Sequence, residues 1–412
     1  MSLYSSFTAS SPCPPSLEKA TANLNAWVEV DLAAQRQNVQ VLKAEFGEGV
    51  ALIAVVKANA YGAGIDGVAR SLEHDGADRF AVVWLDEALQ LRELGVKRPI
   101  LVLGGTPPAR AEEAVAAGLT LTCDSEALGV ALSQAAGFRG RRAVVHLHHD
   151  SGLNRDGLTA RELVPLAKTL RELPNLTVEG LSTHMANADE ANDSFSATQL
   201  AEFHALSREL SWIPFRHTAN SATGLRRRAA KYNGVRVGLA LHGVLPDNTA
   251  QAGLEPVLSL RARVLRVHDV SPGEGVSYGL TWRARDAARV ALIPVGYADG
   301  WHRSLGNRGA VLLNGRRCPI VGRVCMDQFV VDVTAAGAVV PGDVATMIGA
   351  QEGAALDARE VAAQAGTIAW DILASIQPRL ARLFHRNGNV EAVTEPGGRV
   401  THYLALDPPS TV

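Results

Sequence analysis

Residues 51–64, ALIAVVKANAYGAG, join a run of six apolar residues to a lysine and a segment with two glycines. A continuous apolar run of this length is typical of a strand buried on both faces, as in parallel sheets that helices cover. Lys57 stands at the end of this strand. The stretch therefore predicts a parallel sheet that carries an amine at its carboxyl edge.

Seven further short β-rich runs follow, with helix-like segments between them. The eight runs are ALIAVVK, RFAVVWL, PILVLGG, LTLTCD, RAVVHLHHD, LTVEGLSTHM, FRHTANS and VRVGLALHG. Strands that alternate with helices indicate parallel βα units. Eight consecutive units predict a closed (β/α)₈ barrel of the TIM type within residues 26–255, with a doubly wound open sheet as the alternative.

A second domain is expected after the barrel. A chain of 412 residues exceeds what one hydrophobic core usually supports. Residues 256–412 contain period-two stretches separated by glycine, proline and asparagine turns, which predict a mainly β domain. The early run AWVEVDL has the same alternation, so residues 26–38 fit either domain. Residues 1–25 have neither the basic leader nor the apolar core of a signal peptide, and we expect a flexible extension.

Composition narrows the classes of partner. The net charge is −2, with 47% apolar and 20% charged residues, so there is no bulk attraction to nucleic acid or to an anionic membrane. No stretch approaches 18 uncharged apolar residues, which argues against a membrane span. The four cysteines form no C-x-x-C pair, so we expect neither a metal site nor a disulfide framework. These features predict a cytoplasmic protein, and its partners have to be inferred from its sites.

Lys57 has two interpretations. Catalytic groups of such barrels lie at the carboxyl ends of strands, so the amine would project into the active-site mouth. A partly desolvated amine has a lowered pKa and attacks carbonyl carbons to form Schiff bases. Alternatively, its ammonium group simply reaches water at the end of the strand. The residues alone favour this second interpretation.

A resemblance reverses that preference. AVVKANAYGAG closely resembles the lysine segment of the alanine racemases, and seven further segments of their pattern follow in order over residues 27–385. These are DSGLNRDG, STHM, NSA, VRVG, VSYG, PVGYADGW and GRVCMDQF. The resemblance implies an enzyme that uses pyridoxal 5'-phosphate to interconvert L- and D-alanine. It also implies a barrel followed by a β domain, and a homodimer whose active sites are shared between subunits.

The same resemblance assigns the catalytic residues. It implies that Lys57 forms the aldimine with the cofactor and is one base, and that Tyr278 is the second. Racemisation removes a proton from one face of the α-carbon and returns one to the other, which needs two bases. Tyr278 needs positive or hydrogen-bonding neighbours, and the likeness places His184 and Arg236 there. Arg236 is also implied to donate to the pyridine nitrogen, which it cannot protonate.

Further residues are implied to bind the cofactor or the substrate. Arg155 would face the phenolic oxygen of the cofactor, and Met326 and Asp327 would line the carboxylate side of the substrate together with Arg155. The implied ligands of the phosphate group are Tyr61, Asn220, Ser221 and Gly238. Loop N–H groups at the ends of the last barrel strands commonly bind phosphate.

Four positions depart from the family pattern. His148 replaces a lysine that is often carbamylated to hold the arginine, so Arg155 would need another partner, either His148, Asp150 or a bound anion. The other three departures are Trp370 in place of a tyrosine, Ala63 in place of a histidine and His242 in place of a tyrosine. They leave open a racemase of broader or different amino-acid specificity.

Three other classes of function remain open. A non-catalytic cofactor-binding barrel would need Lys57 but not a second domain with Tyr278. A decarboxylase with the same two-domain plan could use the same lysine, although PVGYADGW and GRVCMDQF resemble racemases instead. The last class is a degenerate relative that binds the cofactor with little activity.

Overall fold

The computed structural model describes residues 14–245 and 253–402, and these form two compact units. The barrel unit comprises residues 36–58 and 69–254. Of the described residues, the β unit comprises 14–35, 59–68 and 255–402. We expected a boundary at residue 255 and left residues 26–38 open to either domain, whereas residues 59–68, which we placed in the barrel, also belong to the β unit.

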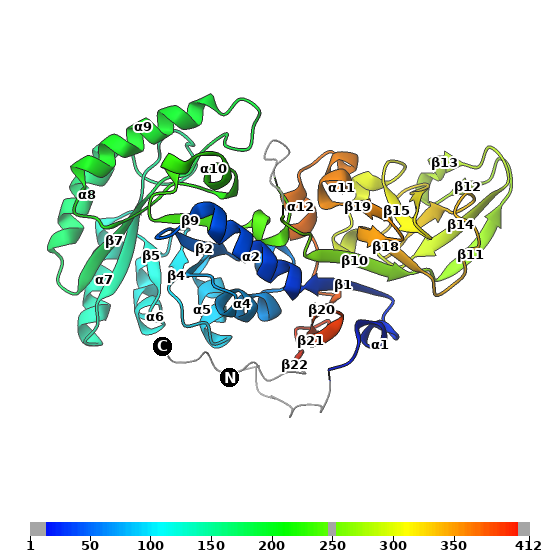
Figure 1. The fold of residues 1–412 in the computed structure, drawn as a ribbon, viewed down its shortest axis with the longest axis horizontal. Coiled ribbons are helices and arrows are strands. Elements are labelled where there is room, and N and C mark those ends of the chain that lie inside the picture. Colours follow the sequence, from blue (N-terminus) through cyan, green and yellow to red (C-terminus); the bar gives the residue numbers. More distant parts are fainter. Residues whose placement is uncertain (1–13, 246–252, 403–412) are drawn as a thin grey trace. The chain divides into compact units, whose positions relative to one another are not determined.

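The barrel unit contains eight strands, all parallel to their neighbours (Figure 1). In chain order they are β2 (Ala51–Val55), β3 (Arg79–Val82), β4 (Ile100–Val102), β5 (Thr120–Thr122), β6 (Ala143–His148), β7 (Leu176–Ser182), β8 (Phe215–His217) and β9 (Gly234–Val237). They correspond to the eight predicted runs. Their order in the sheet is β8-β7-β6-β5-β4-β3-β2-β9.

The ends of this sheet approach each other at β8 and β9. The N–H of Asn233 donates to the carbonyl oxygen of Arg216 at 3.0 Å, and the N–H of Arg236 donates to that of Ala219 at 3.0 Å. These two bonds join the last strand to the one before it. The barrel prediction is therefore confirmed, and the open sheet is excluded.

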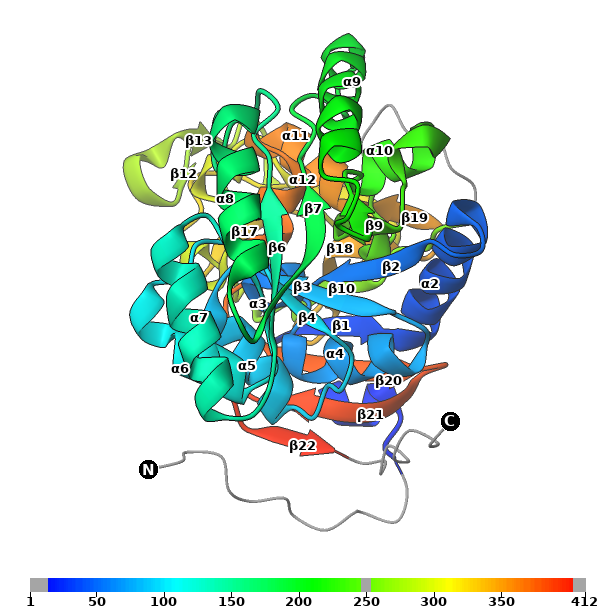
Figure 2. The same cartoon turned by 90° about the vertical axis from the view of Figure 1, so that its left-hand side faces the viewer.

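Helices cover the outside of the strands, and α7 and α8 run along β6 and β7 (Figure 2). The helices are α2 (Leu32–Phe46), α4 (Ile65–His74), α5 (Leu85–Glu93), α6 (Ala111–Ala116), α7 (Glu126–Phe138), α8 (Ala160–Glu172), α9 (Ser194–Glu209) and α10 (Ser221–Arg226). Helix α8 illustrates why they form. Thr159 and Glu162 make a capping box at its start, and Leu163, Ala167 and Leu170 bury one stripe at helical spacing.

The β unit is built on a nine-stranded sheet, which confirms the mainly β prediction. Its strands are β1 (Ala26–Asp31), β10 (Leu258–Arg263), β15 (Ala310–Leu313), β16 (Arg316–Pro319), β18 (Val344–Gln351), β19 (Ala354–Leu356), β20 (Ala381–Arg386), β21 (Asn389–Thr394) and β22 (Val400–His402). Strand β1 pairs with β10 and β20, so the run that fitted either domain lies in this sheet.

Smaller elements complete the two units. The β unit also contains β11 (Arg266–Val270), β12 (Gly275–Val276), β13 (Trp282–Arg283), β14 (Ala288–Ile293), β17 (Phe329–Asp332), α11 (Ala358–Ala365) and α12 (Ala369–Ala374). The 3₁₀ helices are η1 (Pro108–Arg110), η2 (Arg228–Ala230), η3 (Leu239–His242), η4 (Tyr278–Leu280), η5 (Tyr297–Asp299) and η6 (Arg303–Leu305).

Residues 14–25 differ from the flexible extension that we expected, whereas residues 1–13 lie outside the described part of the chain. Helix α1 (Leu17–Thr21) begins at a Ser16 cap. Leu17 of this helix packs against the buried cluster that contains Trp27. The helix is therefore part of the β unit. Within the described ranges, no helix is both long and apolar enough to cross a bilayer.

Residues 59–68 dock closely onto the β unit. Gly62 has a φ of +80°, and a Cβ there would lie 2.0 Å from the carbonyl oxygen of Leu373. The Nε of Arg382 donates to the carbonyl oxygen of Gly62 at 2.9 Å. Burial lowers the pKa of Arg382 to about 10, so its guanidinium stays charged at neutral pH. The segment after Lys57 is thus held to the β unit at Gly62, where the close contact with Leu373 leaves no room for a side chain.

This docking predicts the effect of Gly62→Ala. An alanine at position 62 has both the cost of a positive φ and a steric clash with Leu373. Gly47→Ala has only the cost of a positive φ, because Gly47 has a φ of +88° and no neighbour within 4 Å. We expect Gly47→Ala to destabilise by about 1–2 kcal/mol and Gly62→Ala by about 2 kcal/mol more. Urea unfolding followed by circular dichroism measures both. Equal midpoints for the two variants would contradict the packing described for Gly62.

Candidate active site

Lys57 follows β2 and is half-buried. Its pKa is lowered, first by burial and then by the positive charge of Arg155, against the opposing effects of Glu87 and Asp156. A lowered pKa raises the fraction of neutral amine near pH 7, and the neutral amine is the nucleophilic form. The surroundings of Lys57 thus favour the neutral amine, which is the form that Schiff-base chemistry uses.

The backbone behind Lys57 is unusual. Helix α3 (Lys57–Tyr61) is left-handed, because residues 58–61 have φ values of 52°, 54°, 52° and 55°. This conformation costs about 1–2 kcal/mol per non-glycine residue. The N–H of Ala58 donates to a Glu87 carboxylate oxygen at 2.7 Å, and the Asn59 side chain accepts the N–H of Ile65 at 2.8 Å. Strain of this kind, held in place by specific contacts, is typical of functional sites.

Arg236, on β9, is buried among acceptors. Its Nη1 donates to Nδ1 and to the carbonyl oxygen of His217 at 2.7 and 2.8 Å. Its Nη2 lies within 3.1 Å of Nδ1 of His184 and of the carbonyl oxygens of Thr183 and Thr218. No described residue accepts from its Nε. Burial, and then the charge of Arg155, lower the pKa of Arg236 to about 10, so it stays charged at neutral pH.

His184 follows β7 and is kept neutral. Because Arg236 can only donate, Nδ1 of His184 accepts and the ring proton lies on Nε2. Burial and the charge of Arg236 lower the pKa of His184 well below its ordinary value. Arg155, His148 and Lys57 add smaller effects of the same sign, which places these groups around one site in the barrel unit.

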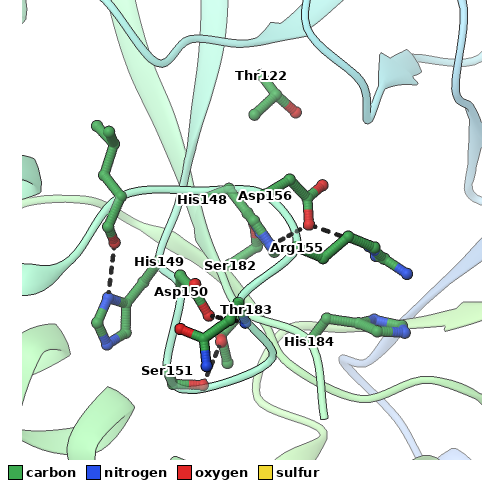
Figure 3. A network of polar contacts seen from close by, with 12 residues as sticks. Thr122, His148, His149, Asp150, Ser151, Arg155, Asp156, Ser182, Thr183 and His184 are labelled. Carbon is green, nitrogen blue, oxygen red and sulfur yellow. Dashed lines mark hydrogen bonds and ion pairs between the residues drawn. The ribbon is translucent and has the colours of Figure 1, made fainter. Parts of the chain in front are cut away.

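Arg155 is held by its sequence neighbour (Figure 3). Its Nε donates to Oδ1 of Asp156 at 3.2 Å, and the same oxygen lies 3.9 Å from Nε2 of His148. His148 makes its own hydrogen bond, 2.9 Å from Nδ1 to the Ser182 hydroxyl. Asp150 instead accepts two backbone N–H groups of its own loop. Of the partners proposed for Arg155, neither His148 nor Asp150 contacts its guanidinium, and Asp156 was missed.

Short helices begin at the carboxyl ends of β8 and β9. The side chain of Asn220 caps α10 by accepting the N–H of Thr223 at 2.9 Å, and Ser221 is the first residue of that helix. Gly238 precedes η3. The barrel fold thus places these three predicted phosphate ligands on neighbouring strands.

The other predicted site residues belong to the β unit. Tyr278 and Met326 are 73% and 52% exposed. Their loops are joined, since the hydroxyl of Ser277 donates to the carbonyl oxygen of Arg323 at 2.7 Å. Asp327 pairs with Arg379 at 2.9 Å. The structure therefore gathers Tyr278, Met326 and Asp327 in one region of the β unit.

Tyr61 is the fourth predicted residue in the β unit, and it is buried. Burial raises the pKa of its phenol, which stays protonated at neutral pH.

Comparisons with known proteins agree with this architecture. The model of the alanine racemase N-terminal domain matches residues 30–246, and that of the C-terminal domain matches residues 257–384. An alanine racemase of Carboxydothermus hydrogenoformans is 40% identical over 365 residues, which cover 87% of this chain and 99% of that protein. One from Geobacter sulfurreducens is 40% identical over 86% of this chain and 96% of that protein.

The chain belongs to the alanine racemase family. Solved structures of that family share the fold. The Bacillus anthracis alanine racemase with bound L-Ala-P has a TM-score of 0.83 and 38% identity, over 92% of this chain and 98% of that one. The Bartonella henselae enzyme with covalently bound pyridoxal phosphate has a TM-score of 0.80 and 30% identity, over 88% and 99%.

The remaining departures from the alanine racemase pattern lie in packed surroundings. Ala63 and His242 are buried, and burial lowers the pKa of His242 to about 4, so its imidazole is neutral. Trp370 is half-buried in the first turn of α12. These three side chains thus alter the packing and add no charge.

The lowered pKa of Lys57 predicts selective labelling. Reductive methylation needs neutral amine, so its rate at Lys57 should fall less between about pH 9 and pH 7 than at the exposed Lys97. Quantitative peptide mass spectrometry of protein free of cofactor measures both rates in one sample. The same pH dependence at the two lysines would contradict the electrostatics described for Lys57.

Proposed function

We propose that this chain interconverts L- and D-alanine by a two-base mechanism, with pyridoxal 5'-phosphate as its cofactor. The observation that carries the proposal is the site around His184 in an alanine racemase-family barrel. The buried cation Arg236 bonds Nδ1 of His184 at 3.0 Å, and, besides burial, the charges of Arg236 and of Lys57 both lower the pKa of that histidine. Relatives of this chain carry the name alanine racemase, and one was solved with bound L-Ala-P.

The donor set fits the cofactor. Lys57 offers a nucleophilic amine for its aldehyde carbon, and the Nε of Arg236 offers an N–H that the protein does not use. Ser221 and Gly238 lie where barrel loops commonly bind phosphate, Asn220 shapes that loop, and the resemblance adds Tyr61. When bound, pyridoxal phosphate supplies an electron-withdrawing ring that makes the α-proton of an amino acid removable.

Each catalytic residue has one task in this proposal. Lys57 holds the cofactor and takes or returns a proton at Nζ, and Tyr278 does the same at its phenolic oxygen. Arg236 binds the pyridine nitrogen while keeping its own proton, since an arginine stays charged. His184 supports that guanidinium. Arg155, held by Asp156, contacts the phenolic oxygen and the substrate carboxylate.

We also propose a homodimer with shared active sites. Tyr278 and Met326 are exposed on the β unit of a single chain, although the proposal gives both a role at the substrate. A partner subunit would cover them, and Asp327 with them. Each barrel unit would then work with the β unit of the other subunit, and a separated subunit should be almost inactive.

The two-base mechanism predicts an asymmetric defect in Tyr278→Phe. Racemisation should fall by about 10²–10⁴-fold, while Lys57 still exchanges the α-proton of one enantiomer without inverting it. Chiral chromatography and deuterium incorporation in D₂O measure the two reactions. Tyr297→Phe is the control, since Tyr297 is also an exposed tyrosine of the β unit. Equal loss of exchange from both enantiomers would contradict the assignment of Tyr278.

Subunit mixing tests the shared site. Lys57→Ala and Tyr278→Phe should each be inactive, and a mixed dimer should regain activity because one of its two sites then contains both native residues. The variants are mixed, partly unfolded and refolded together, and the mixed dimer is isolated by two affinity tags. Activity that stays at the level of the separate variants would show that each site lies within one chain.

A further inference from the structure

A continuous line of polar side chains runs through the interior of the barrel unit. Its members come from five strands: Arg79 of β3, Glu179 of β7, His146 of β6, His217 of β8 and Arg236 of β9. Barrel interiors are ordinarily filled by branched apolar side chains. Buried polar groups cost stability unless all of them are paired, so a complete line of this kind calls for an explanation.

Between Arg236 and Glu179, each hydrogen bond of this line has its donor on the Arg236 side. Nη1 of Arg236 donates to Nδ1 of His217 at 2.7 Å, so the proton of that ring lies on Nε2. Nε2 of His217 lies 2.9 Å from Nδ1 of His146, and Nε2 of His146 lies 2.9 Å from an oxygen of Glu179. Both rings are therefore neutral and carry their proton on Nε2.

A carboxylate fixes this direction at the far end. Glu179 receives two hydrogen bonds from Arg79, at 2.8 and 2.9 Å. The hydrogen bond from His146 is the largest cause that lowers the pKa of Glu179, so the carboxylate is ionised at neutral pH. The guanidinium of Arg79 lies 4.3 Å from the centre of the Phe215 ring, which packs beside both imidazoles. Glu179 can therefore only accept, and Arg79 holds it in place.

We propose that Glu179 is a positioning residue for racemisation, acting through His146 and His217 to keep Nδ1 of His217 as an acceptor for Arg236. This inference rests on the proposed function. Nη1 of Arg236 then stays bound within the protein, and Nε remains the N–H for the pyridine nitrogen. Without the carboxylate, each imidazole can carry its proton on either nitrogen. An Nδ1–H on His217 would face the N–H of Arg236 and displace the guanidinium.

The test compares Glu179→Gln with Arg79→Gln. Both remove one member of the ion pair, but only the first replaces the carboxylate that faces His146, which can only accept, by an amide that can also donate. ¹⁵N NMR of histidine-labelled protein without cofactor reports which ring nitrogen carries the proton, with signals assigned by single His→Gln variants. Wild type and Arg79→Gln should show the Nε2–H form for His146 and His217 between about pH 6 and pH 9. Glu179→Gln should show a mixture of the two forms.

Kinetics of the cofactor-loaded enzyme complete the test. In Glu179→Gln we expect kcat for L-alanine to fall at least about tenfold while KM changes by less than about twofold, because Glu179 acts on the reacting group and not on substrate binding. The kcat of Arg79→Gln should fall less than the kcat of Glu179→Gln. A wild-type protein with the proton on Nδ1 of either histidine overturns the inference, even if the variants fail to fold. Unchanged tautomers or kcat in a folded Glu179→Gln overturn it too. After either of these outcomes, racemisation by the wild-type enzyme would still support the proposed function. If the wild-type enzyme does not racemise alanine, the proposed function and this inference are both contradicted.

Discussion

The site depends on one buried positive charge. Arg236 stands inside the barrel unit, where an unpaired ion would cost several kcal/mol, and it is stabilised by carbonyl oxygens and neutral imidazoles. Burial lowers the pKa of Arg236 only to about 10, so the guanidinium stays charged at neutral pH. Its electrostatic effect extends to His184, His217 and His148, whose pKa values it helps to lower. The barrel thus provides a fixed cation among histidines that stay neutral.

Lys57 is placed by a different kind of constraint. The left-handed turn that follows it is stabilised by Glu87 at its first N–H, and the carbonyl oxygen of Gly62, just after the turn, accepts from Arg382. Those contacts must offset the free-energy cost of the left-handed backbone. Strand β2 is therefore followed directly by a left-handed turn, and not by the right-handed helix of a regular βα connection. The same segment connects the strand that carries the amine to packing in the β unit.

Much of the fold could be predicted because the strands are short, apolar and regularly spaced. Each of the eight predicted runs of the barrel corresponds to an observed strand, whereas the alternation in residues 26–38 fitted either domain and did not decide that β1 joins the β sheet. The left-handed turn could not be predicted, since Ala58, Ala60 and Tyr61 have no preference for positive φ and the contact of Ala58 with Glu87 is distant in sequence. The Arg155–Asp156 pair could have been found, since an acid stands next to the arginine.

The polar line inside the barrel had no usable sequence signal. Each of its histidines alone is typical of a satisfied core residue, and only the register between strands brings His146, His217 and Glu179 together. The catalytic pairing of Lys57 with Tyr278 was likewise inferred from motifs that resemble a family. The departures at His148, Ala63, His242 and Trp370 explain why alanine itself needs a direct test.

The most direct test is proton NMR of the α-position in D₂O, with purified protein, added pyridoxal phosphate, and L-alanine, L-serine and larger or basic L-amino acids as separate substrates. Chiral analysis of the same samples detects the D-isomers. We expect exchange of the α-proton with formation of the D-isomer, fastest for alanine. No exchange on any substrate, in protein that binds the cofactor at Lys57, would contradict it.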